Sequence, residues 1–346
     1  MMVIEGITKF TNCRLLRGHE LVCDDLWVSS TTGKILRSQA AFYDELLLPD
    51  NTIDLGGRII SPGFIDSQLN GAFGFNFSTV LDDMSRYDEK VRELNKKLVQ
   101  TGVTSYVPTV TSQTPELYHQ VLRHLGPSAP DRTASSGSES LGAHVEGPFI
   151  SPLRNGVHNI AVLRRATAFK DFEEVYGSTN LSSSTTTPGP VKMITLAPEL
   201  TPEITNMLIP LLRERGIIVS VGHSNATYEE ASAAVAAGAT MITHIFNAMA
   251  PLHHRNPGIF GVLGLADHAP SRPYFGVIAD GIHLHPATVK IAWNTHPDGF
   301  ILVTDAMHMA GLPDGRYPWR NGEDDDFIVK RGAVLLLEGR ETIAGR

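Results

Sequence analysis

The sequence is poor in cysteine and contains no long apolar run. Cys13 and Cys23 are the only cysteines among 346 residues, which excludes a disulfide framework and a metal site built from thiolates. No apolar stretch approaches the roughly 20 residues needed to span a bilayer. The N-terminal stretch MMVIEGITKF also lacks the basic and apolar regions of a signal peptide. We therefore expect a cytoplasmic protein with reduced thiols and no contact with a membrane.

An excess of basic charge is absent as well. The formal net charge is −8 and the pI is about 5.9, which argues against a nucleic-acid partner or an acidic membrane surface. An anionic small molecule stays compatible with this balance, because its site needs only one or two cationic side chains. The hydrophobic content of 42% is ample for a large core. The length suits one large α/β domain with a small appendage.

The N-terminal segment differs in style from the rest of the chain. Its apolar stretches KFTNCRLL, LVCDDLWVSS and GKILRS are short, and a turn signal lies at Thr31–Gly33. This pattern predicts short antiparallel strands. We expect residues 1–57 to form a small β-sandwich appendage and residues 58–346 to form the main domain.

The main domain alternates between buried strands and helices. Eight of its stretches are apolar without strict alternation, as is typical of parallel strands covered on both faces: RIISPGFIDSQLN, VTSYVPTV, LGAHVEGPF, VKMITLAPE, IIVSVGHS, TMITHIFNA, YFGVIADGIH and GFILVTDAM. Helical patterns lie between most of them: Asp82–Thr101, Pro115–Leu125, Ala161–Tyr176, Pro202–Arg215, Glu229–Ala237 and Pro286–Asn294. Eight strands in this order predict a TIM-like (β/α)₈ barrel, with a doubly wound sheet as the alternative.

Three segments interrupt this rhythm. Residues 126–140 and 177–189 are rich in Ser, Thr, Gly and Pro, and we expect them to be solvated loops without a functional role. The segment Gly315–Leu337 contains the acidic run Glu323–Asp326 followed by FIVKRGAVLLL. We expect an inserted loop and hairpin there, with the acidic run as a solvated turn and not as a metal site.

Ionisable side chains gather where the apolar runs stop. Eleven of the fourteen histidines lie between His144 and His308. In a barrel enzyme the C-terminal ends of the strands carry the chemistry. A buried carboxylate or imidazole is costly unless it is paired or binds a metal. The polar residues at these ends are Asp66 and Gln68, His144 and Glu146, His223, His244 and Asn247, Asp280 and His283, and Asp305.

Three of these residues form a candidate set of metal ligands. Glu146, His223 and His244 offer two imidazoles and one carboxylate, which leaves a coordination position for water. The set favours one divalent metal ion per subunit, with Zn²⁺ as the first choice and Fe²⁺, Co²⁺ or Mn²⁺ as alternatives. The competing interpretation is a pair of buried, hydrogen-bonded structural histidines.

Asp305 follows the last apolar run, in VTDAM. A carboxylate at this place can act as a general base toward a water on the metal. Its alternative role is to orient one of the ligand histidines.

Seven motifs occur in an order that resembles one enzyme family: PGFID, HVEGPF, LAPE, GHSNATY, THIFNAM, ADGIH and VTDAM. From about Phe10 to the last residue the chain resembles the N-acetylglucosamine-6-phosphate deacetylases of the amidohydrolase superfamily. The resemblance implies a (β/α)₈ barrel with a small β domain built from both ends of the chain. It also implies a homodimer that hydrolyses N-acetylglucosamine-6-phosphate to glucosamine-6-phosphate and acetate, in amino-sugar catabolism.

The resemblance also implies roles for individual residues. It assigns the metal to Glu146, His223 and His244, and the proton transfer to Asp305. It gives His158, in RNGVHN, the task of polarising the acetyl carbonyl. Arg255, in HHRNPG, would bind the phosphate, near the site of the partner subunit, because the planar guanidinium binds phosphate oxygens bidentately. The remaining expected substrate contacts are Val157, Asn247, Ala248, Asp280, His283, Ile343, Ala344 and Gly345.

The sequence departs from the broader superfamily at two places. Many amidohydrolases carry His-x-His after the first strand, whereas this chain has Gln68 and Asn70 there, and we therefore expect a single metal. Relatives also continue beyond the motif around Ile343–Gly345, so we expect the C-terminal part of the family fold to be missing here. Two alternatives stay open at this point: another amidohydrolase, such as a deaminase or cyclic-amide hydrolase, and a truncated, non-catalytic sugar-phosphate-binding relative.

Overall fold

The structure is a computed structural model that describes residues 6–37, 43, 46–128, 133–184, 188–265, 272–321, 324–340 and 342–345. The chain divides into two compact units, Met1–Gly63 and Phe64–Arg346. Residues 129–132 and 185–187 of the two Ser/Thr-rich segments, and Glu323 of the acidic run, lie outside the described part. Within the described part, no helix combines the length and the apolar character needed to cross a membrane.

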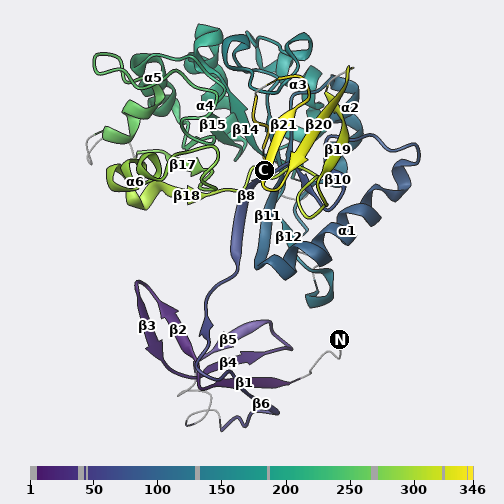
Figure 1. Cartoon of the computed structure of the whole chain (residues 1–346), viewed down its shortest axis with the longest axis vertical. Helices are drawn as coiled ribbons and strands as arrows, with labels where there is room; N and C mark the ends of the chain where they lie inside the picture. Colours follow the sequence, from purple (N-terminus) through teal and green to yellow (C-terminus); the bar gives the residue numbers. More distant parts are fainter. Residues whose placement is uncertain are drawn as a thin grey trace. The chain divides into compact units, whose positions relative to one another are not determined.

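The N-terminal unit consists of short strands in two small sheets (Figure 1). One sheet has the order β5-β4-β1-β6 and the other the order β3-β2-β7. Most neighbours are antiparallel, as the sequence predicts, but β6 pairs with β1 and β7 pairs with β2 in parallel. Cys13, Leu15 and Trp27 are buried in this unit. The strands are β1 (Ile7–Thr11), β2 (Arg14–Arg17), β3 (Glu20–Cys23), β4 (Leu26–Ser29), β5 (Lys34–Leu36), β6 (Asn51–Asp54) and β7 (Ile59–Ile60).

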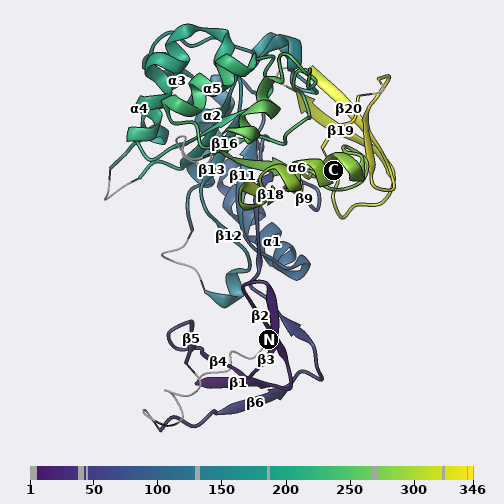
Figure 2. The ribbon, with the colours of Figure 1, turned by 90° about the vertical axis from the view of Figure 1, so that its left-hand side faces the viewer.

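The second unit is built on eight parallel strands that form a nearly closed barrel (Figures 1 and 2). The end of the first strand meets the segment that follows the last one, through a parallel bridge between Leu69 and Ala306. The predicted α/β fold with a TIM-like barrel is thereby confirmed. The barrel strands are β8 (Phe64–Leu69), β11 (Val103–Val110), β13 (Ala143–Glu146), β14 (Val191–Leu196), β15 (Ile218–Val221), β16 (Met241–Ile242), β17 (Tyr274–Val277) and β18 (Phe300–Leu302).

Helices lie between the strands, close to the predicted positions. They bury apolar side chains against the outer faces of the strands, in one continuous core. Helix α5 has a capping box, in which Thr227 and Glu230 satisfy each other's backbone N–H groups. Its end is set by Gly238 in the left-handed region. The helices are α1 (Tyr87–Leu98), α2 (Pro115–Val121), α3 (Phe169–Tyr176), α4 (Ile209–Glu214), α5 (Tyr228–Ala237) and α6 (Pro286–Thr295).

Two predicted segments differ from the structure. The expected helix Ala161–Tyr176 is shorter, because α3 begins only at Phe169, where Asp171 accepts hydrogen bonds from the backbone N–H groups of Thr167 and Ala168. The expected loop and hairpin of Gly315–Leu337 is a three-stranded antiparallel sheet of β19 (Gly315–Asn321), β20 (Asp324–Arg331) and β21 (Val334–Leu337). The expected acidic turn is wrong, because residues from Asp324 onward continue a strand that pairs with β19.

Smaller strands and short 3₁₀ or π segments complete the described fold. Strands β9 (Gly71–Ala72) and β10 (Phe75–Asn76) form a small ribbon after β8, and β12 (Glu139–Ser140) pairs with the start of β11. Behind β19–β21, a second cluster of buried side chains includes Met309, Trp319 and Ala344, so this sheet has a small core of its own.

Candidate active site

The three predicted metal ligands meet at the C-terminal edge of the barrel. Glu146 is the last residue of β13, His223 follows β15 and His244 follows β16. All three are buried, and one ligand atom from each lies within 4.8 Å of the others. His244 Nε2 is 3.0 Å and His223 Nε2 is 3.3 Å from Glu146 Oε1, and the two nitrogens are 3.1 Å apart. The three donor atoms therefore point to one place, which suits a small cation.

Unusual backbone angles direct the side chains of His223 and Asp305 toward the site. His223 has φ 47° and Asp305 has φ 49°, conformations that L-residues adopt rarely and mostly where the surroundings enforce them. The loop after β15 is held by Glu199, which accepts hydrogen bonds from the hydroxyl of Ser224 and the N–H of Asn225. His223 Nδ1 lies 2.9 Å from the carbonyl oxygen of Arg154, a bond that requires the proton on Nδ1 and leaves Nε2 free as a ligand.

The electrostatics of the cluster also favour a cation. Burial alone would raise the pKa of Glu146, but the hydrogen bonds and charges of His223 and His244 outweigh it and hold that pKa well below the usual range. Burial would lower the pKa of His244, whereas its hydrogen bond to Glu146 and the charges of Glu146 and Asp305 raise the pKa to about 9. The buried carboxylates thus draw positive charge to this point, which a proton or a metal ion can supply.

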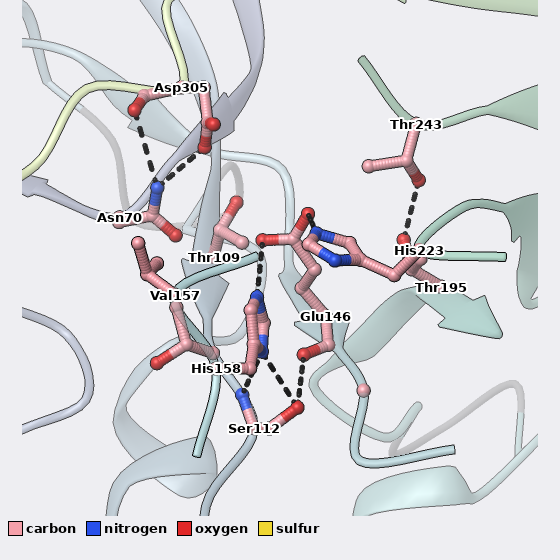
Figure 3. A network of polar contacts seen from close by, with 12 residues as sticks. Asn70, Thr109, Ser112, Glu146, Val157, His158, Thr195, His223, Thr243 and Asp305 are labelled. Carbon is pink, nitrogen blue, oxygen red and sulfur yellow. Dashed lines mark hydrogen bonds and ion pairs between the residues drawn. The ribbon is translucent and has the colours of Figure 1, made fainter. Parts of the chain in front are cut away.

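Asp305 is joined to the metal ligands by amide side chains from β8 and the residues after it. Gln68 Nε2 donates to Glu146 Oε1 at 2.9 Å and to Asp305 Oδ1 at 3.1 Å. Asn70 Nδ2 donates to Asp305 Oδ1 at 2.7 Å (Figure 3). Gln68 thus bridges the two carboxylates, and Asn70 adds a second amide donor to Asp305.

The protonation of Asp305 depends on its burial. Burial and the charge of Glu146 raise the pKa of Asp305 to about 7, against the opposing effects of His244 and Asn70. A carboxyl group with a pKa in this range can accept and return a proton near neutral pH. Asp66, the carboxylate predicted near the end of β8, has a different role. It accepts hydrogen bonds from the hydroxyl and N–H of Thr304 and therefore holds β8 against the segment after β18.

His158 reaches the same place from the loop after β13. Its side chain is buried, and Nε2 lies 3.9 Å from Glu146 Oε2. Its Nδ1 contacts Ser112 (Figure 3). Burial and then the charge of His223 lower the pKa of His158 to about 3, so the ring is neutral at physiological pH. A neutral imidazole at this position can donate a hydrogen bond to a carbonyl oxygen.

The predicted contacts from the end of the chain lie beside the same site. His283 Nδ1 is 2.8 Å from Asp280 Oδ2, and its Nε2 is 3.1 Å from the carbonyl oxygen of Ala344. Burial would raise the pKa of Asp280, but hydrogen bonds from the backbone and side chain of His283 and from the N–H of Ile282 lower it. Gly345 packs against Asp305 so closely that a Cβ would lie 2.1 Å from the carbonyl oxygen of that residue.

Four further predicted contacts lie on segments near the ligands. Ala248 accepts a hydrogen bond from the N–H of Ser224, which ties the loop after β16 to the loop after β15. Asn247 carries a buried Nδ2 without a hydrogen-bond partner among the described residues. The carbonyl oxygen of Val157 accepts a hydrogen bond from Asn321 Nδ2 on β19. Ile343 is half-exposed and bridges to Leu336 on β21.

Arg255 is placed differently from the other predicted residues. Its side chain is exposed, and its hydrogen bonds are to residues of its own loop, His253 and His254. The described contacts therefore do not join it to Glu146, His223 or His244. Its role in phosphate binding stays a prediction.

Two groups near the site escaped the sequence reasoning. Ser112 follows β11 and is fully buried against His158. The polar stretch after the run VTSYVPTV was the available signal. The sequence indicated Gln68 only as a reason to expect a single metal, whereas the structure shows that it donates to two carboxylates. His144, by contrast, is a buried structural residue, held between the hydroxyls of Thr109 and Thr195.

Together, these residues can perform hydrolysis. They offer a carboxylate able to move a proton, a neutral imidazole able to donate to a carbonyl oxygen, and a three-atom site for a divalent ion, within one buried cluster. This combination is typical of hydrolysis assisted by a single metal ion.

The comparisons with known proteins agree with this chemistry. Residues 59–314 match the model of the amidohydrolase family. An N-acetylglucosamine-6-phosphate deacetylase from Danio rerio is 45% identical over 345 residues, which cover 98% of this chain and 79% of that protein. The human enzyme of the same name is 41% identical over 344 residues, covering 98% of this chain and 78% of its own length. A crystal structure of the Pasteurella multocida deacetylase superposes with a TM-score of 0.77 at 27% identity, covering 98% of this chain and 80% of that one.

Proposed function

The chain belongs to the N-acetylglucosamine-6-phosphate deacetylases of the amidohydrolase family, and on that premise we propose how its residues carry out the reaction. The reaction is the hydrolysis of N-acetylglucosamine-6-phosphate to glucosamine-6-phosphate and acetate. The oxygen of water bonds to the acetyl carbon, the carbon–nitrogen bond breaks, and the nitrogen leaves with an added proton. The observation that carries the assignment of residues is the buried cluster of Glu146, His223 and His244 with Asp305 linked to it through Gln68.

Glu146, His223 and His244 would hold the metal ion. Their donor atoms converge, and the Nδ1 of His223 is already engaged by a backbone carbonyl, so the set fits a divalent ion. When bound, such an ion makes a coordinated water more acidic and polarises a carbonyl group. The mixture of nitrogen and oxygen ligands supports Zn²⁺ as the native metal. Gln68 and Asn70 occupy the place of a second pair of ligands as amide donors, which supports one ion per subunit.

Asp305 and His158 supply the proton transfer and the carbonyl contact. Asp305 takes a proton from the attacking water and delivers it to the leaving nitrogen, a task that suits a pKa of about 7. His158 donates its Nε2 hydrogen to the acetyl oxygen as negative charge develops there. Because His158 is buried and Asp305 is partly buried, these interactions act in a medium less polar than water, where they are stronger.

The substrate is oriented by residues around this cluster. Asp280 and His283, together with Ile343–Gly345, bound one side of it, and Val157, Asn247 and Ala248 lie on loops beside the ligands. We propose Arg255 as the phosphate ligand, in a homodimer where it serves the site of the partner subunit. Its exposure on a loop supports that arrangement. We also propose a cytoplasmic location, in line with the free thiols of Cys13 and Cys23 and a phosphorylated substrate.

One experiment tests this function. The protein is purified with Zn²⁺, and acetate release is followed from N-acetylglucosamine-6-phosphate and from N-acetylglucosamine. We expect release from the phosphorylated sugar and a kcat/KM at least about 100-fold lower without the phosphate, since remote binding energy holds the acetamido group in place. No release from either sugar contradicts the function, and equal release from both contradicts the phosphate contact.

Arg255→Ala separates the phosphate contact from the rest of the site. We expect this variant to raise KM for the phosphorylated sugar about tenfold or more and to leave the rate with the unphosphorylated sugar unchanged. Arg17→Ala, on an exposed position of the N-terminal unit, is the matched control. A normal KM in Arg255→Ala removes this residue from the proposal without affecting the assignment of the reaction.

A further inference from the structure

Ser112 contacts His158 with two groups at once. It lies just after β11, and its side chain is fully buried. Its backbone nitrogen is 3.2 Å and its hydroxyl oxygen is 2.7 Å from His158 Nδ1. The same hydroxyl lies 3.2 Å from the backbone oxygen of Glu146, so one serine touches both a metal ligand and the imidazole beside it (Figure 3).

These contacts determine which nitrogen of His158 carries the hydrogen. A backbone N–H is always a donor, so the Nδ1 that it faces must be the acceptor. The hydroxyl has a single hydrogen, for which Nδ1, at the shorter distance of 2.7 Å, and the backbone oxygen of Glu146 compete as acceptors. The neutral ring therefore carries its hydrogen on Nε2, the nitrogen that faces the Glu146 carboxylate across 3.9 Å. The opposite tautomer would place two hydrogens between His158 Nδ1 and the backbone nitrogen of Ser112.

The surroundings hold Ser112 in this position. The hydroxyl oxygen of Tyr118 lies 2.9 Å from the carbonyl oxygen of Thr111 and 2.9 Å from that of Gly147. Tyr118 therefore ties the segment after β11 to the segment after β13. At Gly147 a Cβ would lie 2.2 Å from Ser112 Oγ, so the absence of a side chain there allows the close approach. The loop of His158 is fixed in turn by Asn155, whose Nδ2 donates to the carbonyl oxygen of His158 at 2.7 Å.

We propose that Ser112 is a positioning residue for the deacetylation: it holds His158 in the Nε2–H tautomer and orients that hydrogen toward the acetyl oxygen. The inference rests on the proposed role of His158. A histidine in the other tautomer presents a lone pair, and not a hydrogen, to the carbonyl oxygen. Loss of the Nε2–H tautomer therefore destabilises the transition state more than the bound substrate.

The tautomer is measured directly in the zinc-loaded protein. Two-bond ¹⁵N–¹H correlation spectra of ¹⁵N-histidine-labelled protein separate protonated from unprotonated ring nitrogens, and His158→Gln identifies the signal. We expect an unprotonated Nδ1 and a protonated Nε2 in the wild type. In Ser112→Ala we expect a weaker preference for this tautomer, because only the longer contact from the backbone N–H remains. A protonated Nδ1 in the wild type overturns the proposal. This measurement needs no turnover, so it separates failure of the inference from failure of the proposed function.

Kinetics test whether Ser112 acts through His158. We expect Ser112→Ala to lower kcat about tenfold, with KM and zinc content unchanged, and to have no further effect in a His158→Gln background. Ser138→Ala is the matched control. The hydroxyl of Ser138 is also buried, but it donates to the backbone oxygen of Val103, at the start of β11, and not to a site residue. It should reduce thermal stability but not kcat. Equal losses from Ser112→Ala in both backgrounds, or an unchanged kcat in the single variant, overturn the proposal.

Discussion

Asn70 donates a hydrogen bond to Asp305 across the seam where the barrel closes, with Nδ2 2.7 Å from Oδ1. Gln68, two residues earlier, donates to the same oxygen and also to Glu146. The amide of Gln68 thus bridges the carboxylates of Glu146 and Asp305. Burial and the charge of Glu146 raise the pKa of Asp305, and the hydrogen bond from Asn70 lowers it, so this bond helps Asp305 to lose its proton.

Replacing Asp305 by Asn should remove the base and preserve the fold. The amide oxygen of Asn can still accept the hydrogen bonds from Asn70 and Gln68. We expect kcat to fall by about 10²- to 10⁴-fold while zinc content stays normal. Initial rates of acetate release and elemental analysis measure the two quantities. Near-normal turnover would show that another group moves the proton.

Removing the donor at Asn70 should shift the pH profile. Asp305 acts as a base only when ionised, so activity rises as the pH passes its pKa from below. The hydrogen bond from Asn70 stabilises the ionised form, and its loss in Asn70→Leu raises the pKa. We expect the acidic limb of kcat/KM to move to higher pH by about one unit, which corresponds to about 1.4 kcal/mol. A limb that stays in place or moves to lower pH contradicts the link between these residues.

Zinc binding should release about one proton from His244 at pH 7, together with part of a proton from Asp305. In the metal-free protein the pKa of His244 is raised to about 9, so the ring is protonated at neutral pH, whereas a metal ligand must be neutral. Glu146 is already ionised and contributes no proton. Calorimetry in two buffers with different ionisation enthalpies counts the protons released. Zinc affinity should therefore rise with pH between 6 and 8, and a pH-independent affinity would exclude a protonated His244.

Gly345→Ala should displace the segment Ile343–Gly345 from its place beside Asp305. A Cβ at this position would lie 2.1 Å from the carbonyl oxygen of Asp305, so the segment that also brings Ala344 to His283 must move. We expect kcat/KM to fall about tenfold or more with little change in zinc content. Gly264→Ala is the control, because a Cβ there meets no atom within 4 Å. Equal kinetics in the two variants would place Ile343–Gly345 outside the substrate site.

The convergence of Glu146, His223 and His244 was predictable because it depends on strand order. His223 and His244 each follow a short apolar run, and parallel strands deliver their C-terminal residues to one edge. The same reasoning drew attention to Glu146 and Asp305. It also pointed to His144 and Asp66, whose side chains instead form hydrogen bonds with the hydroxyls of Thr195 and Thr304. A polar residue near the end of a strand can therefore have a structural role.

The sequence alone predicted the alternation of strands and helices, and it drew attention to Glu146, His223 and His244, whose donor atoms the structure brings together. These properties are written in local patterns and in residue chemistry. Only the tertiary structure decided that Ser112 contacts His158, that Gln68 donates to two carboxylates, and that Ala344 meets His283 across 61 residues of sequence. Such contacts depend on the exact path of loops between strands, and loop paths follow from long-range packing and backbone angles that no local pattern encodes.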